Sequence, residues 1–182
     1  MTGDVVDLIM QDHREVERLF DELKQHRDKR PLLTPVLAAM LTAHSRAEES
    51  EVYPVAKKEA GEDEEVAHSQ QEHAQAEEML VRLTGADPES PEYDRLLGEL
   101  SEAVRHHVQE EESTVLPKMR DRLDERRRTE LGAAFATSRA KHLGDQPGEA
   151  TSRELQQQAR NAGISGASAM SKDELATQLR NL

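Results

Sequence analysis

The stretch HSRAEESEVYP, residues 44–54, returns later in the chain as HVQEEESTVLP, residues 107–117. Both copies follow the pattern H-x-x-x-E-E-S-x-V-x-P, which sets a histidine four positions before a glutamate. On a helix, residues four apart lie on one face about one turn from each other. Each copy therefore presents an imidazole beside a carboxylate, an arrangement suited to binding a metal ion.

The repeat extends beyond these two stretches. The segment DHREVERLF, residues 12–20, matches EHAQAEEML, residues 72–80, so His13 corresponds to His73. Each of these segments precedes one copy of the first pattern at a similar distance. The sequence thus indicates that one helical hairpin is duplicated.

Apolar residues recur at three- and four-residue steps in four long segments, at about residues 4–28, 31–60, 63–84 and 91–123. Short loops between long helices favour an all-α fold, an up-down-up-down four-helix bundle. Residues from about 124 to 140 predict a short fifth helix, which we expect on one end of the bundle.

We expect the chain to divide into a bundle at residues 1–142, a linker at 143–150 and a small helix-loop-helix module at 151–182. The linker contains Gly144, Pro147 and Gly148, which are typical of loops. In the module, Ser171 and Glu174 have the spacing of a capping box at the start of the last helix.

The composition excludes several classes of protein. The chain carries a formal net charge of −13, which argues against a general phosphate-binding surface. It contains no cysteine, so disulfides, thiolate metal sites and cysteine nucleophiles are excluded. No apolar run is long enough for a membrane span and no signal peptide is recognisable, so we expect a cytoplasmic protein without a membrane partner.

Antiparallel bundling would bring one histidine from each helix, and a glutamate from two of them, to about the same depth in the core. Ionisable groups on an apolar face need a partner that offsets their desolvation. We therefore predict a site for two iron or manganese ions. The predicted ligands are His13, His44, Glu48, His73, His107 and Glu111.

The order H…HxxxE…H…HxxxE, with the aligned Pro54 and Pro117, resembles the hemerythrin-like, or HHE cation-binding, family over residues 1 to about 142. The resemblance implies a non-haem di-iron centre with an oxo or hydroxo bridge, with manganese as the second choice of metal. It also implies that the four histidines are terminal ligands and that Glu48 and Glu111 bridge the ions. The ferritin type of di-iron bundle has a different order of ligands.

One departure from the family bears on the reaction. Oxygen-carrying hemerythrins have a further histidine four residues before the one that matches His73, and this chain has Ser69 there. The six predicted ligands and a bridging oxygen then leave two coordination positions of a six-coordinate pair open. This favours reaction with peroxide or O₂, including catalase-like disproportionation of H₂O₂. The alternatives are a protein that binds or senses iron, O₂ or nitric oxide without turnover, and a bundle whose histidines bind nothing.

Two further residues are candidates near the metals. A helical wheel places Tyr53 opposite His44, facing solvent, but a kink at Pro54 would turn its phenol toward the metals as an extra ligand. Glu77 is more nearly inward and is a candidate acceptor for a ligand imidazole. The remaining histidines lie off the apolar stripes and are interpreted as surface residues: His26, His68, His106 and His142.

The C-terminal module resembles the small helix-loop-helix at the N-terminus of the Rho transcription terminator. The resemblance implies a nucleic-acid-associated element. Residues 151–182 contain four basic and three acidic side chains, however, so the electrostatic footprint of such a surface is missing. A module that docks on the bundle or on a protein partner is the other interpretation.

Overall fold

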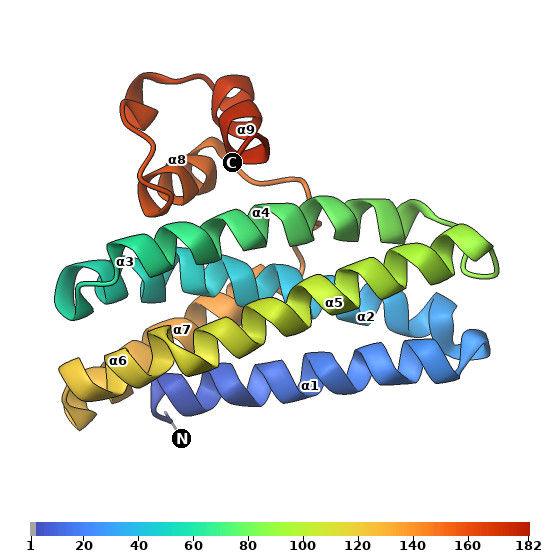
Figure 1. Ribbon diagram of the computed structural model, residues 1–182, viewed down its shortest axis with the longest axis horizontal. Helices are drawn as coiled ribbons and strands as arrows, with labels where there is room; N and C mark the ends of the chain where they lie inside the picture. The colour runs from blue at the N-terminus through green and yellow to red at the C-terminus, as the bar shows by residue number, and fades with distance from the viewer. Residues whose placement is uncertain (1–2) are drawn as a thin grey trace.

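The computed structural model describes residues 3–182, which form helices and no strands. Four long helices lie side by side along the molecule: α1 (Val5–Gln25), α2 (Arg30–Ala47), α4 (Asp63–Gly85) and α5 (Pro91–Ser113) (Figure 1). α1 packs on α2 and α5, and α4 packs on the same two helices. The predicted all-α, up-down-up-down bundle is confirmed.

The helix starts follow from local side-chain chemistry. Asp4 accepts a hydrogen bond from the backbone N–H of Val6 at 2.9 Å, and Ser90 accepts one from Tyr93 at 3.1 Å, so each caps the helix that follows it. Pro91 occupies the first position of α5, where its missing N–H costs nothing. The short turn η1 (Arg27–Lys29) joins α1 to α2.

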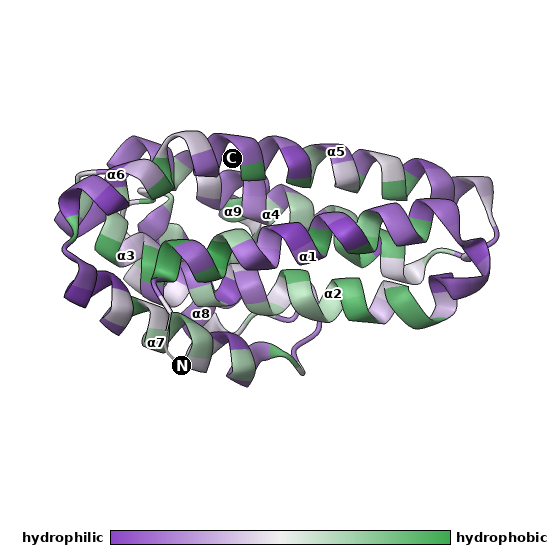
Figure 2. Cartoon of the chain, turned by 90° about the horizontal axis from the view of Figure 1, so that it is seen from below, coloured by the Kyte–Doolittle hydropathy of each residue, from purple (hydrophilic) through white to green (hydrophobic). Residues whose placement is uncertain are grey.

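The apolar core has two parts, one toward each end of the bundle. One part gathers around Ile9, Val52 and Phe135, and the other around Phe20, Leu37 and Leu100. Hydrophilic and hydrophobic residues alternate along the ribbons of α1 and α5, as expected for helices with one buried face (Figure 2). The predicted metal ligands lie in α1, α2, α4 and α5 and the turn after α2. Residues of both apolar clusters border them, among them Phe135 from the first and Val16 from the second.

The second helix is not the continuous α-helix that its sequence predicts. After α2, the chain forms a π-helical turn η2 (Glu48–Val52), a single α-turn α3 (Tyr53–Val55) and a second π-helical turn η3 (Ala56–Ala60). The N–H of Tyr53 donates to Glu48 O, five residues back. Pro54 has no N–H to donate, which favours an irregular ladder here. A π turn takes in one extra residue, so it rotates the following side chains around the axis.

The second copy of the repeat accommodates its proline differently. α5 ends at Ser113, Thr114 is non-helical with φ −123° and ψ −69°, and α6 (Val115–Arg122) continues beyond it. The two copies of the hairpin therefore have the same backbone up to Glu48 and Glu111, and their backbones differ after these residues.

The fifth helix, α7 (Glu125–His142), lies against both α1 and α2 rather than only on one end of the bundle. Phe135 packs its ring edge-on against His44, with centroids 5.8 Å apart, and Arg139 contacts Asp12. In the middle of α7, Gly132 lies so close to the N-terminal segment that a Cβ on it would be 2.1 Å from the Gly3 carbonyl oxygen. α7 thus reaches the predicted site.

The C-terminal residues form α8 (Ser152–Asn161), a short 3₁₀ turn η4 (Ala167–Ala169) and α9 (Lys172–Arg180) around a small apolar cluster of their own (Figure 1). Both helices contact α4, and α8 also contacts η2. His142, expected on the surface, is 8% exposed and pairs with Asp145 at 2.6 Å where α7 ends. None of the helices in residues 3–182 has the length and apolar character needed to cross a bilayer.

Candidate metal centre

The structure brings the six predicted ligands together in the bundle interior. α1 supplies His13, α4 supplies His73, and α5 supplies both His107 and Glu111. His44 lies in α2, and Glu48 begins the π-helical turn η2. No member of the set is more than 8% exposed, and Glu48 is completely buried.

The Nε2 atoms of the histidines point at the two buried carboxylates. His44 and His73 approach Glu48 Oε2 at 3.3 and 3.4 Å. His13 and His107 approach Glu111 Oε2 at 3.3 and 3.9 Å. Donor atoms of His13, His44 and Glu48 form one group within 4.8 Å of each other, and those of Glu48, His73 and His107 form a second. Glu48 belongs to both groups, which is the placement a bridging carboxylate requires.

The other nitrogen of every imidazole faces a carboxylate outside this set. The four Nδ1 contacts span 2.8–3.2 Å and pair His13 with Glu112, His44 with Asp12, His73 with Glu49 and His107 with Glu72. A carboxylate that accepts from Nδ1–H fixes the tautomer in which Nε2 carries a free lone pair. All four imidazoles are thus oriented to bind a cation through Nε2.

These four acceptors were missed by the sequence reasoning, although the repeat contained a signal for them. Asp12 and Glu72 directly precede the matched histidines His13 and His73, and Glu49 and Glu112 directly follow the two buried glutamates. Each acceptor serves a histidine on a neighbouring helix, so the hairpin symmetry extends to the groups that orient the ligands.

Three of the four acceptors are backed by an arginine. Arg139 contacts Asp12, Arg14 contacts Glu112, and Arg46 contacts Glu49 at 3.1 Å. The fourth, Glu72, lies instead beside His68 and His106, with imidazole nitrogens 3.5 and 3.7 Å from its Oε1.

Tyr53 is completely buried, which corrects its expected position facing solvent. The hydroxyl lies 3.0 Å from His73 Nε2 and 3.5 Å from Glu48 Oε2. The π turn η2 is the reason. Its extra residue rotates the side chain of Tyr53 around the helix axis, from the solvent-facing side predicted for an α-helix to the side that faces the bundle interior. Leu116, the matching residue of the second copy, is also buried but has no polar atom to offer.

Glu77 contacts no ligand imidazole, contrary to its expected place near the centre. Its carboxylate accepts from Arg46 and, at 2.9 Å, from the backbone N–H of Gly148. Glu77 therefore holds the segment after α7 against α4, and within residues 3–182 its hydrogen bond to Arg46 links it to the site.

Several buried polar atoms of the site have no hydrogen-bond partner: His13 Nε2, His44 Nε2, Glu48 Oε1 and both Glu111 carboxylate oxygens. Leaving such atoms unpaired in a protein interior costs about 1–3 kcal/mol each. Among the described residues eight buried side-chain atoms are unpaired, and five of them belong to the predicted ligand set; the other three are Thr42 Oγ1 and the two carboxylate oxygens of Glu62. Imidazole nitrogens with carboxylate oxygens are a donor set suited to iron. The residues present fit a bound cation.

The sequence profile of the hemerythrin HHE cation-binding domain matches residues 4–119. The chain belongs to this family. It is accordingly a metal-binding hemerythrin-like protein, and the cations of such domains are typically iron.

Two curated relatives have similar sequences. A protein named DNA nickase from Nostoc sp. is 28% identical over 149 residues, which cover 81% of this chain and 42% of the relative. An uncharacterised hemerythrin-like protein from Schizosaccharomyces pombe is 27% identical over 135 residues, 72% of this chain and 66% of the relative. The chain thus spans less than two thirds of either relative. No solved structure matches it significantly.

The charges of this hemerythrin-like site depend on each other. Burial lowers the pKa of His44, but the carboxylates of Glu48 and Asp12 outweigh burial and raise that pKa to about 10. Glu48 and Glu49 likewise outweigh burial at His73 and raise its pKa to about 9. Burial raises the pKa of Tyr53 well above its usual range, and the nearby charge of Glu48 adds to this effect. Without a metal, protons on His44 and His73 help to balance the buried carboxylates.

A small cavity lies beside the four imidazoles. Its volume is about 30 Å³, and its other walls include the apolar side chains of Val16, Leu41, Val104 and Val108. A water molecule needs about 10–15 Å³ of such space. The hemerythrin-like centre therefore has a space next to it that could hold about two water molecules.

Proposed function

We propose that this protein is a non-haem di-iron protein that reacts with hydrogen peroxide or O₂, with catalase-like disproportionation of peroxide as the favoured reaction. The observation that carries the proposal is the set of inward-facing atoms without partners in the described residues, which His13, His44, Glu48 and Glu111 leave in a layer of side chains at most 8% exposed. The donor atoms form two groups that share Glu48, one with His13 and His44 and one with His73 and His107, so we expect one cation at each group.

His13 and His44 would hold one iron, and His73 and His107 the other. Their rings are close neighbours within each pair, with centroids 5.1 Å apart for the first and 4.7 Å for the second. Glu48 and Glu111 would bridge the ions. The four imidazoles favour iron over manganese, which prefers sites richer in oxygen ligands.

Tyr53 is proposed as a further ligand, or a proton donor, on the His73 side. Its phenol stays protonated in the metal-free site, and its hydroxyl donates to Glu48 Oε2. A phenolate would form only beside a cation. Because Leu116 occupies the matching position, the two irons would differ, and the one held by His13 and His44 would keep the more open position.

In disproportionation, one H₂O₂ is oxidised to O₂ while a second is reduced to two molecules of water. The iron pair would supply the two-electron redox chemistry that no side chain here can supply. The protein would fix the imidazoles through four carboxylates, exclude bulk water with the apolar walls, and hold a proton at Tyr53 Oη near the reacting oxygens. The size of the cavity would restrict the substrate to small oxidants.

The test is O₂ evolution from H₂O₂ by the iron-loaded protein, followed with an oxygen electrode. We expect steady turnover that is lost in His44→Ala and in Glu111→Ala. The matched control is His26→Ala, which removes an exposed histidine four residues after Glu22 and should retain turnover. A stable oxygenated adduct without turnover would contradict the proposal.

The alternative is a protein that binds or senses iron, O₂ or nitric oxide without turnover. It shares the same ligands, so metal content does not distinguish the two. Two additions to the reduced protein distinguish the two functions. A sensor would form a stable adduct with nitric oxide, and it would leave added peroxide unconsumed.

Two features favour an action on DNA: the name of the Nostoc relative and the resemblance of the C-terminal module to the helix-loop-helix of the Rho terminator. The C-terminal module has nearly balanced charge, and the whole chain is strongly acidic, so counterion release would contribute little to binding. Incubating supercoiled plasmid with the iron-loaded protein tests this second candidate. We expect no nicking when peroxide and free iron are absent.

A further inference from the structure

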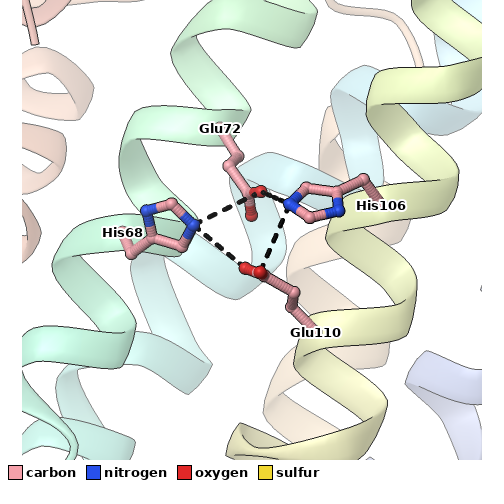
Figure 3. Close-up of side chains that lie close together, drawn as sticks. All are labelled: His68, Glu72, His106 and Glu110. Carbon is pink, nitrogen blue, oxygen red and sulfur yellow. Dashed lines mark ion pairs between the residues drawn. The ribbon is translucent and has the colours of Figure 1, made fainter.

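A second cluster of histidines and glutamates lies on the outside of the bundle. His68 and Glu72 come from α4, His106 and Glu110 come from α5, and all four side chains converge on one point between the helices (Figure 3). Each pair has the same H-x-x-x-E spacing as the buried ligands.

The distances within the cluster fit a single small cation. His68 Nε2 lies 2.9 Å from Glu110 Oε2 and 3.5 Å from Glu72 Oε1, and His106 Nε2 lies 3.2 and 3.7 Å from the same two carboxylates. Tetrahedral zinc has bonds of about 2.0–2.1 Å to such ligands, which sets its donor atoms about 3.3–3.4 Å apart. The four distances lie between 2.9 and 3.7 Å, on both sides of this value, and the two histidines face different oxygens of Glu110, so small shifts of these side chains would complete the site.

The two carboxylates of the cluster have no lysine or arginine partner among the described residues. Within residues 3–182, no lysine or arginine nitrogen lies within 4.0 Å of the carboxylates of Glu72 or Glu110, whose ion pairs are all with histidines. When both imidazoles are neutral, two negative charges therefore face each other across the cluster.

Glu72 differs from the other three acceptors in what faces its second oxygen. Asp12, Glu49 and Glu112 each orient a buried imidazole and each contact an arginine. Glu72 Oε2 orients His107 at 2.8 Å in the same way, but its Oε1 faces His68 and His106. A cation held by these histidines would take the place that an arginine takes at the other three positions.

We propose that His68, Glu72, His106 and Glu110 form a separate surface site for one divalent cation of the zinc class. Two imidazole nitrogens and two carboxylate oxygens are a donor set that zinc uses. The site joins α4 to α5 and shares Glu72 with the buried centre, so the same carboxylate would bind the cation through one oxygen and hold His107 through the other. The alternative is a set of ordinary ion pairs with protonated histidines.

Isothermal titration of the iron-loaded protein with Zn²⁺ tests the site, with iron content measured before and after to exclude exchange. We expect one more bound zinc per chain in the wild type than in the His68→Ala/His106→Ala double variant. His26→Ala is the control and should match the wild type. The wild type and the double variant have the same buried residues, so the difference in their bound zinc reports on the surface site alone. The result is therefore valid whether or not the buried centre holds iron.

Cobalt gives an independent readout. Co²⁺ in a tetrahedral site of this kind would produce visible absorption that is absent from the double variant. Equal zinc binding by the double variant and the wild type, or no zinc bound by the wild type beyond the buried centre, would overturn the proposal.

Discussion

At the scale of single residues, the carboxylates around the imidazoles distinguish this site from a chance group of histidines. Asp12 is a clear case, because it is 5% exposed, contacts His44 Nδ1 at 3.1 Å and is held by Arg139 from α7. Such acceptors tune both the orientation and the basicity of a ligand imidazole.

Asp12→Asn should weaken iron binding by about 10- to 100-fold, because the amide no longer favours Nδ1–H on His44. Competition with a coloured chelator measures the change. Glu15→Gln is the matched control on the same helix, since Glu15 pairs with the exposed Arg18 and not with a group at the site. Equal iron affinity in Asp12→Asn and the wild type would show that the contact does not orient a ligand.

Tyr53 allows a spectroscopic prediction. If its phenol binds iron, the loaded protein has an intense phenolate-to-iron absorption that Tyr53→Phe abolishes. Tyr93→Phe is the control, because Tyr93 is also buried but bonds Thr34 near the other end of the bundle. Retention of the band in Tyr53→Phe, or its absence from the wild type, would leave Tyr53 only as a hydrogen-bond donor.

At the scale of helices, close packing of α7 on the start of α1 fixes the position of Arg139 and Phe135 at the site. Gly132→Ala places a Cβ against the Gly3 carbonyl oxygen, and we expect overpacking to destabilise the protein by about 1–3 kcal/mol. Thermal or urea denaturation measures the effect.

The matched control is Gly98→Ala on α5, where a Cβ meets nothing within 4 Å. Alanine has the higher helix propensity, so this change should stabilise the protein by about 1 kcal/mol. If both substitutions were stabilising, the close approach of α7 to residue 3 would be wrong.

The sequence predicted the helices but not the irregular part of the second one. A wheel with 100° per residue assumes an unbroken α-helix, and the π turns η2 and η3 break that assumption after Ala47. Tyr53 follows the first π turn and was therefore placed on the wrong side, whereas His44 precedes it and was placed correctly inside. Only the kink expected at Pro54 pointed to the error.

At the scale of the whole molecule, the duplicated hairpin brought the six candidate ligands together as the repeat suggested, because matched helices in a bundle place matched residues at matched depths. Docking of the C-terminal module on the bundle was one of two interpretations of its sequence, but the repeat does not predict which residues make the contact. Gln158 and Asn161 from α8 donate to the Glu49 side chain and backbone carbonyl, both at 2.9 Å, and these contacts join segments far apart in the sequence. No periodicity encodes them.

The metal-free protein should have a stability maximum at mildly acidic pH. The pKa values of His44 and His73 are raised to about 10 and about 9, so their stabilisation is complete below about pH 6.5 and is lost as the pH rises through these values. The pKa of Glu49 is lowered to about 2, chiefly because Arg46 outweighs burial, so its stabilisation is lost as the pH falls from about 4.5 toward 2.

Urea denaturation across pH 3–10 measures this profile. The alkaline loss should be smaller in His44→Ala and smaller again after iron loading, because a cation replaces the imidazole protons. A metal-free protein whose stability stayed constant from about pH 6.5 to 9 would contradict the assigned charges.

The central claim is that one buried layer holds two irons, and the iron content of the reconstituted protein tests it most directly. After anaerobic loading with Fe²⁺ and removal of excess metal, elemental analysis with ⁵⁷Fe Mössbauer spectroscopy should find two irons per chain, and Glu48→Ala should lose them. A wild-type protein that retains one iron or none, or a Glu48→Ala variant that retains both, would contradict the claim.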